Sequence, residues 1–159
     1  MINAIGIDLT ANDATPKFKL GTMSGTIGTE GPSKIYKYVK YLKGAGSVAA
    51  GAGKVAYYPT VTVAGTNTLG TVVTCDLSDS DEVGAGVMQA TVTDTYCGWI
   101  QVHGIATLAA ALTAGADGDP LTPTGSSDGT LDLATAITDN ICATAIDASE
   151  KIVMCNFTY

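Results

Sequence analysis

The chain lacks arginine altogether and has a single histidine, His103, among its 159 residues. Arginine is the side chain best suited to binding phosphates and carboxylates, and histidine is the usual proton carrier near neutral pH. A chain with so little of either is better equipped to be a structural part than an enzyme. We therefore expect no catalytic residue, no cofactor and no metal site.

Paired cysteines are missing as well. Cys75, Cys97, Cys142 and Cys155 are far apart, and no two of them form a C-x-x-C pair. This spacing argues against a zinc knuckle or a dithiol redox site. Free cysteine behaves as a small hydrophobic residue, so we expect reduced, buried thiols in a protein made in the cytoplasm.

Long apolar runs and excess positive charge are also absent. No apolar run approaches the roughly 20 residues needed to span a bilayer. The start of the chain at Met1 has neither a basic n-region nor a long apolar h-region, so it does not match a secretory signal. The net charge is −7, which disfavours binding to nucleic acid. We expect neither a membrane nor a nucleic acid as partner.

Small and β-compatible residues dominate what is present. Glycine, alanine and threonine account for 64 of the 159 residues, and 46% of the chain is hydrophobic, which suits one folded domain. Charge is uneven: residues 1–54 carry +4 and residues 55–159 carry −11. This asymmetry is explained either by solubility or by a basic N-terminal face that docks on an acidic neighbour, such as another copy.

The first 33 residues differ from the rest. They are spaced by Gly21, Gly25, Gly28 and Gly31 and have few large apolar residues after Leu20. We interpret residues 1–33 as an extended arm that a partner orders, with a disordered tail as the alternative. Residues 34–159 form the predicted body.

The body has the pattern of an antiparallel β protein. Short runs alternate apolar residues with Thr, Gln or Ala and are separated by turn residues. We expect an all-β fold, a single small antiparallel β-barrel or β-sandwich with the extended N-terminal arm. The predicted strands are residues 35–42, 55–58, 60–63, 70–75, 87–92, 98–103, 141–146 and 152–157.

Three segments leave a helix open. Lysines at i+3 spacing from residue 34 to residue 43 suit a helix face, but three tyrosines and the Gly-Ala-Gly stop at residues 44–46 favour the strand. Residues 106–112 have good helix propensity, and strand is only slightly preferred there. Residues 131–139 are a weaker candidate helix.

Several motifs suggest chemistry but have simpler explanations. Gly51 and Gly53 fit G-x-G-x-x-A, yet a Thr/Val strand follows where a dinucleotide site needs a helix. The acidic loops 76–82 and 117–119 lack calcium-loop spacing and suit turns. Nothing local places a cysteine beside His103, and Trp99 lies mid-strand, where core or subunit interface is the simpler role.

The order of the segments carries a resemblance. An arm at residues 18–22 (Phe-Lys-Leu-Gly-Thr) precedes a strand at residues 35–40 (Ile-Tyr-Lys-Tyr-Val-Lys) and a glycine-bounded run at residues 46–51. Residues 86–90 (Gly-Val-Met-Gln-Ala), 96–104 (Tyr-Cys-Gly-Trp-Ile-Gln-Val-His-Gly), 114–117 and 143–147 follow. Over residues 18–157 this succession resembles the head decoration, or cement, proteins of tailed bacteriophages. The lysine spacing of residues 34–43 and the length of the loop at residues 117–120 depart from that pattern.

The resemblance implies a virion protein on the outer surface of a phage capsid, made in the host cytoplasm. Its implied partners are the major capsid protein and itself, as a homotrimer that clamps neighbouring capsid subunits. A trimer converts weak contacts into strong avidity, and an extended arm can add strand-to-edge pairing. The candidate capsid or intersubunit contacts are Ile5, Ile7, Leu9, Phe18, Leu20, Lys34, Lys37, Lys40 and Lys43.

Other functions compete with this hypothesis. A carbohydrate- or receptor-binding β-module of a virion, such as a fibre or adhesin domain, would use Trp99 and the tyrosines to stack on sugars. Exposure of Trp99 separates the two hypotheses. A small β-barrel enzyme would need a cleft near His103 or the cysteines, and a tail or major capsid component is a further alternative.

Overall fold

The computed structural model describes residues 6–26, 33–60 and 70–158, and this part of the chain forms a single branched β-sheet. One short 3₁₀ turn, η2 (Leu77–Asp79), accompanies it. The strands are β1 (Met23–Thr26), β2 (Lys34–Tyr41), β3 (Val55–Pro59), β4 (Val72–Val73), β5 (Ser80–Met88), β6 (Cys97–Thr107), β7 (Pro120–Thr122), β8 (Asp132–Leu133), β9 (Ala143–Asp147) and β10 (Ile152–Asn156).

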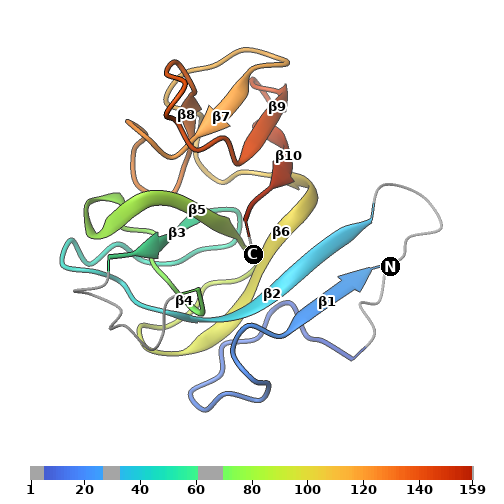
Figure 1. The fold of residues 1–159 in the computed structure, drawn as a ribbon. Coiled ribbons are helices and arrows are strands. Elements are labelled where there is room, and N and C mark those ends of the chain that lie inside the picture. Colours follow the sequence, from blue (N-terminus) through green and yellow to red (C-terminus); the bar gives the residue numbers. More distant parts are fainter. Residues whose placement is uncertain (1–5, 27–32, 61–69, 159) are drawn as a thin grey trace.

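Strand β6 is the spine of the sheet and connects its two ends (Figure 1). Gln101 of β6 is paired with both Tyr36 of β2 and Val87 of β5, so β2 and β5 lie on opposite edges of β6. His103 is paired with both Ile35 of β2 and Asn156 of β10. Strands β5 and β10 therefore follow one another along the same edge of β6. The sheet order continues from β10 through β9 and β7 to β8.

The two faces of the sheet have different environments because side chains alternate along each strand. In β6, Ile100 and Val102 enter the main hydrophobic core, which β2, β3, β5, β9 and β10 also line. Cys97 and Trp99 point to the opposite face and belong to a second, smaller cluster. One strand therefore supports two apolar layers, and all of Cys97–Val102 is buried.

Tyr57 of β3 ties the sheet to the loop before β8. Its hydroxyl donates to the carbonyl oxygen of Thr130 at 2.6 Å and accepts from the Thr130 backbone N–H at 3.0 Å. Burial raises the pKa of this phenol well above its ordinary value, so it stays protonated and able to donate. The backbone of Val55 also donates to Gly129, which fixes the same loop against β3.

The predicted all-β class is confirmed, and the sheet stays open, so the barrel form is not adopted. Strands β2, β3, β6, β9 and β10 lie close to their predicted positions. The strand predicted at residues 87–92 is wrong in its bounds, because β5 runs from Ser80 to Met88. The predicted strand at residues 60–63 lies almost wholly outside the described residues.

Neither candidate helix is present. Residues 106 and 107 complete β6, and residues 108–112 are irregular, with a bend at residues 109 and 110, because the chain there packs Leu108 into the main core. The suggested helix at residues 131–139 is wrong: β8 occupies its start, and Asp139 caps a turn by accepting from the backbone of Thr135 and Ala136, both at 2.8 Å. Local Asp hydrogen bonding competes with helix here.

Candidate functional site

The N-terminal arm lies against the outer face of β2 and β6. Partly buried side chains of the arm pack on a cluster that both strands share, and Figure 1 shows the arm below β2. We call this set the arm cluster. Its members are Ile7, Leu9, Ala11, Phe18, Leu20, Tyr36, Tyr38, Cys97 and Trp99. Four of the predicted contact residues, Ile7, Leu9, Phe18 and Leu20, are thus brought together, and Ile5 lies outside the described residues.

Three aromatic rings form the centre of the arm cluster. Phe18 of the arm meets Tyr38 edge-on at 5.3 Å between ring centroids and Trp99 at 5.4 Å. Tyr38 and Trp99 are 5.0 Å apart and tilted by 54°. Such pairs contribute about 0.5–1.5 kcal/mol each beyond their buried area. Phe18 therefore covers the two aromatic side chains that β2 and β6 present on this face.

Backbone pairing holds the arm in place on both sides of Phe18. Asp13 and Cys97 exchange two backbone hydrogen bonds of 2.9 Å, an isolated bridge to the start of β6. The Asn12 side chain accepts from the Thr93 N–H at 2.9 Å and donates to its hydroxyl at 3.1 Å. After Phe18 the chain enters β1, which pairs antiparallel with β2. The arm thus supplies the terminal strand of the sheet, β1, and also covers the outer face of β2 and β6.

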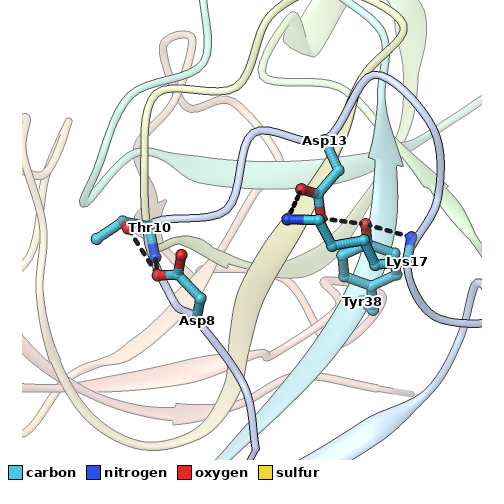
Figure 2. Close-up of polar contacts among 5 residues, drawn as sticks. All are labelled: Asp8, Thr10, Asp13, Lys17 and Tyr38. Carbon is cyan, nitrogen blue, oxygen red and sulfur yellow. Dashed lines mark hydrogen bonds and ion pairs between the residues drawn. The ribbon is translucent and has the colours of Figure 1, made fainter.

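A polar group at Asp13 closes one side of the cluster, as Figure 2 shows. The Tyr38 hydroxyl donates to the Asp13 carboxylate at 2.7 Å, and the Lys17 ammonium forms an ion pair with the same carboxylate at 2.7 Å. Burial of Asp13 opposes its ionisation, but the bonds from Lys17 and Tyr38 outweigh this and lower its pKa. Burial, and then the bond to Asp13, raise the pKa of Tyr38.

Asp8 begins a separate turn at the far end of the arm. Its carboxylate accepts from the Thr10 hydroxyl at 2.6 Å and from the Thr10 N–H at 2.9 Å, and these bonds lower its pKa. Figure 2 shows this pair apart from the Asp13 group. The Asp8 side chain thus stabilises a local bend.

Trp99 is fully buried beneath the arm. Its exposed fraction is 0%, so it offers no face for stacking on a sugar. Its indole Nε1–H is the one buried side-chain polar atom without a hydrogen-bond partner among the residues described here. An unmade bond of this kind costs about 1–3 kcal/mol. The aromatic contacts of the arm cluster are what offset that cost.

The four predicted lysines do not form one basic surface. Successive side chains of a strand alternate between faces, so a spacing of three puts neighbouring lysines on opposite sides. Lys37 is 6% exposed and points to the core side, where its ammonium donates to the Tyr58 hydroxyl at 3.0 Å and lies 5.3 Å from the ring centroid. Lys34 and Lys40 are partly buried, and Lys43 is exposed beyond the strand.

An open cavity of about 170 Å³ lies near the start of β2. Its polar lining includes Lys34, Gln89 and Gln101. The Gln101 side-chain nitrogen donates to the carbonyl oxygens of His103 at 3.2 Å and Ile105 at 3.0 Å, so this amide braces β6. Ligand pockets usually measure about 300–1,000 Å³, so this cavity has room for only a few ligand atoms.

The residues that suggested chemistry have structural surroundings. All four cysteines are free and buried, and burial raises the pKa of each thiol, for Cys75 and Cys155 to about 12. Asp76 caps η2 by accepting from Ser78, and Asp117 accepts from the backbone of Ala148. Within the described ranges, no three His, Cys, Asp or Glu side chains are grouped to hold a metal.

The contacts that sequence reasoning missed join distant parts of the chain. Asp13 and Tyr38 are 25 residues apart, and Asn12 and Thr93 are 81 apart. No local sequence pattern signals either pair, because the partners come close only in the folded chain.

Comparison of the chain with protein-family models, with curated proteins and with solved structures finds no match. No helix in the described part of the chain is long and apolar enough to cross a bilayer. A functional assignment for this protein thus depends on its own residues and their geometry.

Proposed function

We propose that this protein decorates the outer surface of a phage head as a homotrimer and stabilises the shell by clamping neighbouring major capsid subunits. The observation that carries the proposal is that three segments of the resemblance lie side by side. Residues 18–22, β2 and β6 meet in the arm cluster, where Phe18 contacts Tyr38 and Trp99. The segments whose order along the chain resembles that of decoration proteins therefore share a structural role here, which is to hold the arm on the sheet.

The outer edge of β1 supplies a means of attachment. In the sheet order β1 is terminal, and it pairs only with β2 among the strands described. A terminal strand leaves backbone N–H and C=O groups that can pair with an extended segment of another protein. Met23 on this strand is 38% exposed and adds an apolar contact. A capsid subunit with an extended loop fits such an edge.

Clamping capsid subunits together requires no catalytic side chain, and the thiols and carboxylates of this chain have structural surroundings. The thiols are buried with raised pKa values, and the acidic loops are occupied with capping turns. Three copies in one assembly make three contacts at once, and the second and third become intramolecular events. Each single contact can then be weak while the whole complex resists dissociation.

The test is binding of the purified protein to capsids that lack a decoration protein. Cosedimentation should show saturable binding, and decorated capsids should withstand higher temperature than bare ones. An unrelated acidic protein of similar size controls for trapping in the pellet. Absence of saturable binding would contradict the proposal. Deletion of the arm is a poor test, because it also removes Phe18 and β1 from the fold.

A further inference from the structure

An apolar face continues along the outer side of the sheet beyond the arm. In β6 and β10, Ile105 is directly opposite Met154, and Thr107 is opposite Ile152. Met154 is also opposite Thr144 of β9, and although the register shifts at Ile146, Thr144 and Ile146 are both exposed between buried alanines, so Ile146 is on the same side. We call the set Ile105, Ile146, Ile152 and Met154 the isoleucine face.

The described chain covers the isoleucine face only in part. None of its four residues belongs to the main core or to the arm cluster. Ile146 is 42% exposed, and the other three are partly exposed. The arm covers Trp99 near the start of β6 but leaves the end of the same strand open. A partly exposed apolar face of this kind is a candidate interaction site.

The two ends of the molecule have net charges of opposite sign. Residues 108–158 hold seven acids and Lys151, a net charge of −6, whereas residues 6–43 hold six lysines and three acids, a net charge of +3. None of those seven acids forms an ion pair within the described part of the chain. Figure 1 shows the arm and β7–β9 at opposite ends of the molecule.

We propose that a second copy of this chain covers the isoleucine face with the exposed bend of its arm, which carries Lys17 and Lys19. The inference rests on the self-association in the proposed function and specifies its surfaces. Acids of the β9–β10 turn, Asp147 and Glu150, lie beside the face and would meet these lysines. Lys19 is exposed and forms no ion pair within the described residues, and the Lys17 side chain, although paired with Asp13, is 67% exposed.

The two surfaces are different, so the contact is heterologous. An acidic, apolar surface of one copy meets a basic surface of the next, so in a pair one copy keeps its arm bend free and the other keeps its isoleucine face free. Such contacts close into a ring when the rotation between copies divides the circle evenly, and a rotation of 120° gives a trimer. Opposite charges set the order of the surfaces and speed the encounter of the copies.

Two single variants test the contact by sedimentation velocity and light scattering. Ile146→Lys removes apolar contact and sets like charges together, and Lys19→Glu reverses the opposing charge. Each should weaken self-association about tenfold or more. Ile137→Lys is the matched control, because Ile137 is fully exposed on the β8–β9 loop outside the face. Denaturant unfolding of each variant establishes that it is folded.

Mixing the two variants gives the decisive result. An Ile146→Lys copy keeps an intact arm bend, and a Lys19→Glu copy keeps an intact face, so the mixture should form a heterodimer through this one intact contact, which neither variant forms alone. The proposal is overturned if the wild-type protein stays monomeric, if Ile137→Lys weakens association as much as Ile146→Lys, or if mixing recovers nothing. Capsid binding is measured separately: monomers that bind capsids contradict this inference and the trimeric state but not attachment to the capsid, and oligomers that do not bind contradict the attachment alone.

Discussion

Replacing Phe18 with alanine should uncover Trp99 while leaving the main core intact. The ring of Phe18 packs against Tyr38 and Trp99, and all three lie on the outer face of the sheet. The main core lies on the opposite face of β6 and contains no arm residue. The substitution therefore weakens the packing of the arm on β2 and β6 and leaves the packing of the main core unchanged.

The size of the effect follows from the two ring contacts. Each aromatic pair contributes about 0.5–1.5 kcal/mol, so losing both costs roughly 1–3 kcal/mol. Truncation of a fully buried phenylalanine costs about 3–5 kcal/mol, and Phe18 is only partly buried. We expect the free energy of unfolding to fall by about 2–3 kcal/mol.

Trp99 is the only tryptophan and reports directly on the arm. In the native state of Phe18→Ala, acrylamide should quench Trp99 more strongly than in the wild type, and its emission should shift to the red. Phe157→Ala is the matched control, because Phe157 is 1% exposed in the main core. It should lose more stability, about 3–5 kcal/mol, without a change in native-state quenching. Equal quenching in Phe18→Ala and wild type would refute the packing described for the arm.

Three further predictions concern the arm anchor, a backbone contact and the thiols. The Asp13 pKa is lowered from 3.8, so its carboxylate stabilises the fold above that pH and loses this effect as pH falls through the lowered value. Asp13→Asn should therefore cost about 1–3 kcal/mol at pH 7 and much less at pH 2.5, by denaturant unfolding; an equal cost at both would contradict this. Gly53 and Gly118 both have positive φ, but they differ in the space around them. A Cβ added at Gly53 would lie 2.8 Å from the Ala109 nitrogen, whereas a Cβ added at Gly118 would have no atom within 4 Å. Gly118→Ala should cost about 1–2 kcal/mol and Gly53→Ala at least ~1 kcal/mol more, and equal losses of thermal stability would exclude that contact. The four buried cysteines should resist a thiol reagent in the native state and all react in denaturant; rapid native labelling would disprove their burial.

The strands that the sequence predicts well are those with a strong local pattern. The tyrosine- and valine-rich β2 and the alternating β6 follow period-2 patterning, which depends only on neighbouring residues. Strands β7 and β8 were missed because each has only two or three residues, and distant partners define them. The start of β5 was missed because its polar first residues, Ser80 and Asp81, resemble a loop.

The arm illustrates what sequence patterns leave open. Its isoleucine, leucine and phenylalanine residues indicated that something would cover them, and a partner was the expected cover. Instead these side chains lie on Tyr38 and Trp99 of the same chain. Because side chains alternate, β2 and β6 carry apolar residues on both faces. One face lines the main core, and the arm is long enough to cover the other. The same alternation places the lysines of β2 on opposite faces, although their spacing in the sequence suggested one basic surface.

The central claim, attachment to the outside of a capsid, is tested most directly by electron cryo-microscopy of bare capsids incubated with the purified protein. We expect added density on the outer surface, in groups of three copies at threefold or quasi-threefold positions. In each copy, β1 should lie toward a capsid subunit and the isoleucine face should be covered by the arm bend of the next copy. Capsids without added density at saturating protein would contradict the account.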